Sequence, residues 1–199
     1  MSNWEMELKE LAPGICVFSQ DVEWAEACSS IVSNELTELF RPGYVVKDYT
    51  QVVDTDYRKC SALGLDSALL CDNSDPIHIL YTTLEQRTDR SVALFRRKYS
   101  MDPVKRNHEW IVLKYGNADF FKSHNDDCFS FPRSLSVVAY FNDNYSGGEI
   151  SFPFFSISYK PKSGDILLFS SAFPYMHEVS PVLEGERYAA VNWYSYAKL

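Results

Sequence analysis

The sequence predicts a mainly β fold with some α structure, in which a sandwich or barrel occupies the second half of the chain. Residues 110–196 fall into short runs rich in Val, Ile, Phe and Tyr. Turn sequences such as Asn-Asp-Asn, Ser-Gly-Gly and Glu-Gly-Glu separate these runs. Strands spaced roughly 8–12 residues apart in this way are typical of sandwiches and barrels. With 199 residues, of which 46% are hydrophobic and 15% aromatic, the chain is long enough to bury a sizeable core.

The two halves of the chain differ in pattern, and we expect a single domain spanning residues 1–199. Residues 1–105 mix helical and extended patterns and predict a helix-rich support, whereas residues 106–199 predict the β core. Residues 44–75 are polar and mixed, so we expect a strand or two with a long loop. Because long loops beside a rigid scaffold often carry recognition, this segment is a candidate substrate flap.

Two helices are predicted in the first half. Apolar side chains recur at a period near 3.6 within residues 19–40, where Ser19 or Asp21 would cap the start. A second helix opens at Asp75, which is followed by proline at the first helical position, and runs to about Tyr99. We expect the inward-facing residues of this second helix to be Ile79, Leu80, Leu84, Val92, Phe95 and Tyr99.

Composition excludes several classes of protein. The formal net charge of −8 argues against nucleic acid as the main partner, because a phosphate backbone requires a basic surface. No apolar run is long enough to span a membrane, and the charged first ten residues do not form a secretory signal. We therefore expect a cytoplasmic protein without a membrane partner.

The chain has five cysteines: Cys16, Cys28, Cys60, Cys71 and Cys128. They contain no C-x-x-C pair and predict neither a disulfide framework nor a zinc site.

A histidine and an aspartate stand two residues apart in Ser-His-Asn-Asp. Because this segment follows an apolar aromatic pair, an extended backbone would place His124 and Asp126 on one face. Asp127 is the competing carboxylate, and it would face away unless the chain turns. A third ligand must come from another strand. His177 lies in a β run, whereas His78 lies in the helical half and His108 lies just ahead of the β region that begins at Trp110. Both are interpreted as ordinary histidines.

Two histidines and one carboxylate form the facial arrangement of non-haem Fe(II) oxygenases, which leaves coordination positions open. Arg187 lies ten residues after His177, beyond a Glu-Gly-Glu turn that returns its strand beside that of His177. A buried guanidinium needs an anion, and its planar fork matches a carboxylate. We therefore expect Arg187 to hold the far carboxylate of a five-carbon 2-oxo diacid whose other end chelates the iron.

The order H-x-D, about fifty residues, H, ten residues, R resembles the 2-oxoglutarate oxygenases, and its surroundings resemble the prolyl 4-hydroxylase branch. The resemblance covers roughly residues 110–196. Collagen-type members usually have Lys at the position of Arg187, which favours the oxygen-sensor and bacterial-like subgroup. The matching segments are Tyr115-Gly116, Tyr140-Phe141-Asn142, Ser146-Gly147-Gly148-Glu149, Lys162-Ser163-Gly164-Asp165, His177-Glu178-Val179-Ser180-Pro181-Val182, Gly185-Glu186-Arg187-Tyr188 and Trp193.

The resemblance implies a double-stranded β-helix, or jelly roll, with His124, Asp126 and His177 as iron ligands and Arg187 as the co-substrate anchor. It also implies that Tyr115 and Tyr140 lie near the co-substrate and that Trp193 lines its pocket. Packing alone would also explain these three aromatic residues.

The activity implied is an Fe(II)-dependent dioxygenase reaction that uses 2-oxoglutarate and O2, with ascorbate as an optional reductant, and that releases succinate and CO2. The expected substrate is a prolyl residue in a protein or peptide. One alternative is hydroxylation of a free amino acid or another small molecule. Another is a non-catalytic cupin-like module that only binds metal, although such a module has no need of Arg187.

Overall fold

The computed structural model describes residues 7–19, 22–47, 50–106, 109–127 and 132–196. Three residues considered above, Asp21, His108 and Cys128, lie outside this part of the chain. No helix within the described part combines the length and apolar character needed to cross a bilayer. Cys16, Cys28, Cys60 and Cys71 are free thiols.

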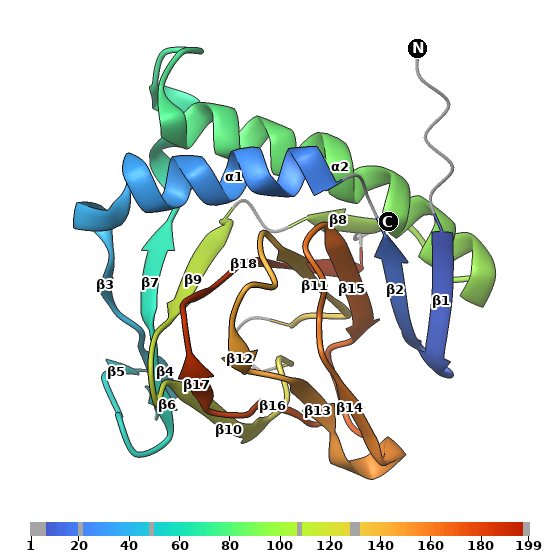
Figure 1. Ribbon diagram of the computed structural model, residues 1–199. Coiled ribbons are helices and arrows are strands. Elements are labelled where there is room, and N and C mark those ends of the chain that lie inside the picture. The colour runs from blue at the N-terminus through green and yellow to red at the C-terminus, as the bar shows by residue number, and fades with distance from the viewer. Residues whose placement is uncertain (1–6, 20–21, 48–49, 107–108, 128–131, 197–199) are drawn as a thin grey trace.

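Two facing sheets carry the fold (Figure 1). The larger sheet has the order β1-β2-β15-β11-β18-β9-β7-β3, with β8 paired to β18. Its strands are β1 (Glu7–Ala12), β2 (Ile15–Ser19), β3 (Arg41–Pro42), β7 (Ser61–Gly64), β8 (Val104–Arg106), β9 (Ile111–Tyr115), β11 (Leu135–Tyr140), β15 (Asp165–Ser170) and β18 (Arg187–Tyr196). The smaller sheet has the order β14-β13-β16-β10-β6 and consists of β6 (Arg58–Lys59), β10 (Phe120–His124), β13 (Ile150–Phe152), β14 (Ile157–Tyr159) and β16 (His177–Val179).

Eight of these strands form a jelly roll. Along the chain, β9, β11, β15 and β18 enter the larger sheet, while β10, β13, β14 and β16 enter the smaller one. Every pairing among them is antiparallel. The chain therefore winds between two sheets with a core between them, as jelly rolls do. Two separate pairs, β12 (Ser146–Gly147) with β17 (Val182–Glu184) and β4 (Val45–Lys47) with β5 (Thr50–Val52), complete the strands.

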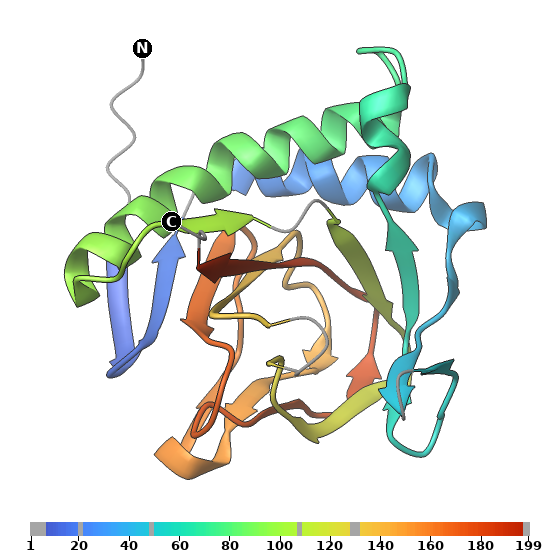
Figure 2. The ribbon, with the colours of Figure 1, turned by 180° about the vertical axis from the view of Figure 1, so that it is seen from behind.

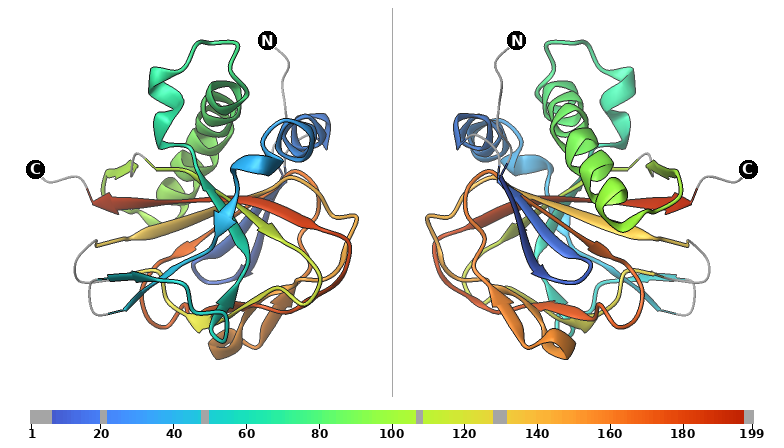
Figure 3. Two further views of the ribbon diagram at one scale, coloured as in Figure 1. Left: turned by 90° about the vertical axis from the view of Figure 1, so that its left-hand side faces the viewer. Right: turned by 90° about the vertical axis from the view of Figure 1, so that its right-hand side faces the viewer.

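Two helices, α1 (Val22–Asn34) and α2 (Pro76–Tyr99), cover the outer face of the larger sheet (Figure 3). The start of α2 follows the sequence prediction, because the Asp75 side chain accepts a hydrogen bond from the backbone N–H of Ile77 at 2.8 Å. Ile79 does not face inward as expected; it is 38% exposed, whereas its neighbour Leu80 is fully buried. Short 3-10 helices span Thr37–Leu39, Asp66–Leu70 and Pro153–Phe155.

The expected helix-rich support in residues 1–105 is not borne out. This half also supplies five strands to the two sheets, of which β1 and β2 extend one edge of the larger sheet and β3 and β7 extend the other. In β2, Cys16 and Phe18 pack toward the helices, while Ile15 and Val17 pack into the space between the sheets. Because residues 15–18 of β2 are buried on both faces, their sequence is uniformly apolar and lacks the alternation that marks a half-buried strand.

The segment expected to form a flap, residues 44–75, contains the β4–β5 hairpin, β6, β7 and a 3-10 helix. The hairpin projects from the body of the protein beside the smaller sheet (Figure 2). Val46, Val52 and Val53 on this projection are exposed. Closure of this segment over a substrate stays a prediction.

Alternation along β11 and β18 separates the two faces of the larger sheet. Val137 and Ala139 of β11 pack in the cluster beneath the helices, whereas Val138 and Tyr140 pack toward the smaller sheet. Along β18, every second side chain points inward: Arg187, Ala189, Val191 and Trp193. Each of the two strands therefore presents one set of side chains to the space between the sheets and the other set to the helices.

The helix–sheet interface should be a major source of stability. Leu84 of α2 is fully buried in this interface, so Leu84→Ala should lower the free energy of unfolding by about 2–5 kcal/mol through lost burial and a cavity. Chemical denaturation followed by circular dichroism measures this change. Leu70, which is 91% exposed, is the matched control, and Leu70→Ala should change stability by less than about 0.5 kcal/mol. Equal effects of the two changes would contradict this packing.

Candidate metal and anion site

Two imidazoles meet at the smaller sheet because their strands are antiparallel neighbours. His124 ends β10, His177 begins β16, and the two residues are register partners. Their ring centroids lie 4.2 Å apart. A shift of register between Phe121 and His124 marks an irregularity in this pairing, and such irregularities re-aim side chains beside functional sites.

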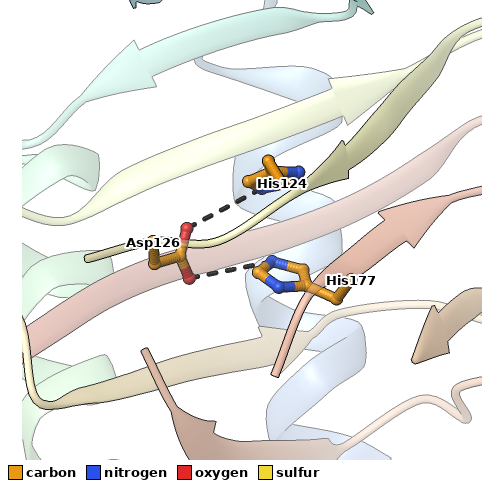
Figure 4. Close-up of side chains that lie close together, drawn as sticks. All are labelled: His124, Asp126 and His177. Carbon is orange, nitrogen blue, oxygen red and sulfur yellow. Dashed lines mark ion pairs between the residues drawn. The ribbon is translucent and has the colours of Figure 1, made fainter. Parts of the chain in front are cut away.

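The Asp126 carboxylate faces both rings (Figure 4). Its Oδ1 lies 3.7 Å from Nε2 of His124, and its Oδ2 lies 3.7 Å from Nε2 of His177. One potential ligand atom from each of the three residues lies within 4.8 Å of the others. Two imidazoles and one carboxylate on one side of a shared point are the donor set of a facial metal site with open positions.

Backbone carbonyls fix the tautomer of both histidines. Nδ1 of His124 donates to the carbonyl oxygen of Lys122 at 2.8 Å, and Nδ1 of His177 donates to that of Tyr175 at 3.2 Å. Because a carbonyl can only accept, Nδ1 carries the proton in each neutral ring. The lone pair of Nε2 then points toward Asp126, as a metal ligand requires.

Burial keeps these groups in ligand-competent protonation states. Burial, and then the neighbouring His177, lower the pKa of His124 to about 3, so its imidazole is neutral near pH 7. Burial alone would raise the pKa of Asp126, but His177, His124 and a hydrogen bond from Ser136 outweigh it and lower that pKa. Asp126 is therefore a carboxylate near pH 7.

Ser136 is a residue that the sequence reasoning missed. Its hydroxyl donates to Oδ2 of Asp126 at 2.6 Å and lies 2.9 Å from the hydroxyl of Ser171. The backbone N–H of Asp126 donates to the carbonyl of Ser171 at 3.0 Å. A signal was present, because alternation in the run Ser-Leu-Ser-Val-Val-Ala-Tyr places Ser136 on the same face as Tyr140.

The cluster opens into a cavity of about 370 Å³ between the two sheets, which Arg187 also lines. Arg187 is only 2% exposed. Its guanidinium carbon lies 4.9 Å from the ring centroid of Tyr115 and 5.0 Å from that of Tyr140. Register explains the first contact, because Arg187 is the partner of Tyr115 across β18 and β9. All four predicted co-substrate residues, Arg187, Tyr115, Tyr140 and Trp193, line this one cavity.

Buried donors around Arg187 lack partners. Among the described residues, Nε and Nη1 of Arg187 and the hydroxyl of Tyr140 find no hydrogen-bond partner although they are buried. None of the described carboxylates forms an ion pair with Arg187. Buried polar groups in native proteins are nearly always hydrogen bonded, and an unpaired buried charge is costly. This end of the cavity therefore fits a carboxylate that comes from outside the chain.

Trp193 lies at the other end of the cavity. It is the register partner of Ser136, and the Arg133 guanidinium lies 3.6 Å from its ring centroid. Trp193 also contributes to the lowered pKa of Asp126. The tryptophan thus lies beside the carboxylate of the metal cluster, six residues along β18 from Arg187. Its role in holding the co-substrate stays a prediction.

The competing residues lie outside the cluster. Asp127 accepts a hydrogen bond from the backbone N–H of Arg133 at 3.0 Å, which turns this carboxylate away from the histidines. His78 lies on α2, where Nδ1 donates to the carbonyl of Ala68 at 2.9 Å. An unpredicted aromatic contact supports the cluster instead: the Phe121 ring stacks on His124 with centroids 3.6 Å apart.

The cluster should bind a divalent transition metal. His177→Ala should weaken Co(II) binding at least about tenfold, because it removes one of three donors. Titration followed by the visible absorption of Co(II) measures the change. The control is His78→Ala, which should bind Co(II) as the unaltered protein does. Retention of Co(II) affinity in His177→Ala would rule out this ligand set.

Comparison with known proteins places this geometry in context. Residues 110–195 match the family model described as the 2OG-Fe(II) oxygenase superfamily. A protein of Acanthamoeba polyphaga mimivirus that carries a prolyl 4-hydroxylase name is 29% identical over 107 residues, covering 44% of each chain. Probable prolyl 4-hydroxylase 9 of Arabidopsis thaliana is 28% identical over 123 residues, covering 47% of this chain and 43% of that protein. The match thus spans less than half the length of these curated relatives.

Solved structures share the fold. A prolyl hydroxylase from Trichoplax adhaerens, in complex with a peptide fragment of hypoxia inducible factor, aligns with a TM-score of 0.72 and 17% identity. The alignment covers 91% of this chain and 83% of that one. A Pseudomonas putida prolyl-4-hydroxylase aligns with a TM-score of 0.67 and 16% identity, covering 92% and 93%. The viral collagen prolyl hydroxylase of Paramecium Bursaria Chlorella virus-1, in its 2OG complex, gives 0.63 and 17%, covering 92% and 97%.

Proposed function

We propose that this chain, which matches the model of the 2OG-Fe(II) oxygenase superfamily through residues 110–195, is an Fe(II)- and 2-oxoglutarate-dependent dioxygenase that hydroxylates prolyl residues in a protein or peptide. One observation carries this proposal. A single cavity is lined by a His-Asp-His cluster and by a buried arginine that has no carboxylate partner among the described residues. The 2-oxo acid group of 2-oxoglutarate matches the first feature, and its distal carboxylate matches the second.

The residues present fit both groups. His124, Asp126 and His177 offer the two nitrogens and one oxygen that suit Fe(II) and leave open positions. Arg187 and Tyr140 offer unpartnered donors to a carboxylate. When bound, Fe(II) with 2-oxoglutarate and O2 supplies the oxidation of an unactivated C–H bond, with release of succinate and CO2.

The protein's own contribution is positioning and exclusion of water. Arg187 and Tyr140 anchor one end of the diacid, so its reactive end is directed along the cavity. Ser136 holds Oδ2 of Asp126, which fixes the carboxylate orientation between the two imidazoles. Leu113, Val138 and Val191 line the wall and keep water away from the reacting groups.

A peptide substrate is favoured over a free amino acid by the chain around the cavity. Tyr44, Val46 and Tyr57, from the segment that carries the β4–β5 hairpin, line the cavity. A projecting hairpin beside a pocket offers contacts to residues that flank the reacting one. The structural relative from Trichoplax adhaerens was solved with a peptide fragment.

A cytoplasmic setting stays part of the proposal, because the free thiols fit a reducing compartment.

Succinate formation tests the activity. We expect release of succinate that requires both Fe(II) and 2-oxoglutarate, which would exclude a module that only binds metal. Arg187→Ala should cost about 2–5 kcal/mol in apparent 2-oxoglutarate affinity, because it removes a buried charge partner. The control is Arg41→Ala, an exposed arginine that does not line the cavity, which should leave the requirement unchanged. An Arg187→Ala protein with unaltered 2-oxoglutarate dependence would contradict the anchor.

Mass spectrometry tests the substrate class. Incubation with a library of proline-containing peptides should yield a gain of about 16 Da on proline in at least one sequence, corresponding to one inserted oxygen atom. Free proline and free lysine serve as competitors in the same assay. Turnover of a free amino acid with no modified peptide would establish the small-molecule alternative instead.

A further inference from the structure

Tyr145 lies behind Arg187, outside the cavity. It is 7% exposed and follows β11 in the chain just before β12. Arg187, Tyr115 and Tyr140 line the cavity, but Tyr145 does not. Its buried hydroxyl finds no hydrogen-bond partner among the described residues. A tyrosine hydroxyl can both donate and accept a hydrogen bond. Burial raises the pKa of Tyr145, and the neighbouring Arg187 guanidinium partly offsets this rise, so the hydroxyl lies within reach of that cation.

Gly148 brings the two side chains together. A Cβ atom placed on Gly148 would lie 3.0 Å from Cε2 of Tyr145 and 3.1 Å from Cδ of Arg187. The hydroxyl-bearing edge of the tyrosine and the stem of the arginine therefore flank the same glycine. The backbone φ of Gly148 is +66°, a conformation that glycine adopts readily and other residues rarely do.

Lys160 fixes the Tyr145 ring from its other side. The Lys160 Nζ lies 3.5 Å from the ring centroid, a cation–π contact. The same ammonium donates hydrogen bonds to the carbonyl oxygens of Tyr145, at 3.0 Å, and Gly147. Lys160 thus holds the ring in place, because its ammonium lies over the face of the ring and is itself bound to two carbonyl oxygens of the same loop.

We propose that Tyr145 is a positioning residue for Arg187, held in place by Lys160. This inference rests on the proposed function and deepens it. When the guanidinium presents its fork to the distal carboxylate of 2-oxoglutarate, its remaining N–H groups need acceptors on the protein side. The Tyr145 hydroxyl supplies one. Because it lies outside the cavity, it acts on the co-substrate only through the orientation of Arg187.

Selectivity between two related acids separates this role from a general structural role. 2-Oxopentanoate has the same carbon chain as 2-oxoglutarate but lacks the distal carboxylate. Tyr145→Phe should weaken 2-oxoglutarate binding to the Mn(II)-loaded protein about tenfold, which corresponds to about 1.4 kcal/mol. Binding of 2-oxopentanoate and of Mn(II) itself should not change. Isothermal titration without O2 measures all three affinities, with competition titrations for the weaker acid.

Tyr194→Phe is the matched control. Its hydroxyl is also buried and without a partner among the described residues, but Tyr194 packs beneath the helices. We expect unchanged affinity for both acids in this variant. Equal 2-oxoglutarate affinity in Tyr145→Phe and the unaltered protein, or an equal loss for both acids, overturns the inference.

Lys160→Met provides a second variant that keeps Tyr145. It should also weaken 2-oxoglutarate binding, and the double variant should be no weaker than Tyr145→Phe alone, because both changes act through one side chain. Fully additive losses would show that Lys160 acts independently of Tyr145. This result would overturn the proposed role of Lys160 in holding Tyr145 in place. If the unaltered protein itself binds the two acids equally, the proposed function fails and this inference with it.

Discussion

Strand β18 is the element on which both ends of the cavity depend, because it is buried on both faces and paired along most of its length. It pairs with β11 on one side and with β9 and β8 on the other. Its inward series runs from Arg187 to Trp193, and its outward residues, such as Tyr188 and Tyr194, pack beneath the helices. A register slip of one residue would bury the wrong set on each face. The apolar packing of α1 and α2 on the sheet therefore also determines where the arginine points.

The interior of the jelly roll carries an unusual concentration of charge for a space between two sheets. The His124 imidazole remains neutral, because burial lowers its pKa, and the Asp126 carboxylate is stabilised by the histidines and Ser136. The rings of Tyr115 and Tyr140 lie against the Arg187 guanidinium. The arrangement is complementary to a metal cation at one place and to an organic anion at the other. Because an unpaired buried charge is destabilising, a ligand that pairs with these groups would stabilise the protein.

Sequence reasoning succeeded where a pattern has a local cause. The spacing of His124 and Asp126 on an extended segment, and the start of α2 at Asp75, follow from backbone geometry over a few residues. Arg187 also lines the cavity. Its position was predictable because the Glu-Gly-Glu turn and the strand that follows it have clear sequence patterns. Clear turn sequences likewise separate the strands of the second half, so a sandwich or barrel was predictable from the pattern, whereas the jelly roll was implied by the family resemblance.

Long-range pairing explains what the sequence did not reveal. The apolar run of β2 gave no periodic signal, since both of its faces are covered. Tyr145 could not be distinguished from the other tyrosines in the sequence. Its position beside Arg187 depends on the close approach at Gly148 and on the contact with Lys160, which follows β14. The sequence did not indicate which end of the cavity Trp193 would line, since only its register with Ser136 of β11 shows that it lies beside Asp126.

The pairing of β2 with β15 has a consequence for the solubility of shortened forms of the chain. Residues Ile166–Phe169 of β15 are fully buried, and β2 satisfies their outer backbone hydrogen bonds. Tyr99 at the end of α2 ties the hairpin down, because its hydroxyl accepts from the backbone N–H of Gly14 at 3.0 Å. Without that hairpin, β15 would become a bare apolar edge that recruits strands from neighbouring molecules. The first two strands thus protect the protein against aggregation, although they contribute no side chain to the cavity lining.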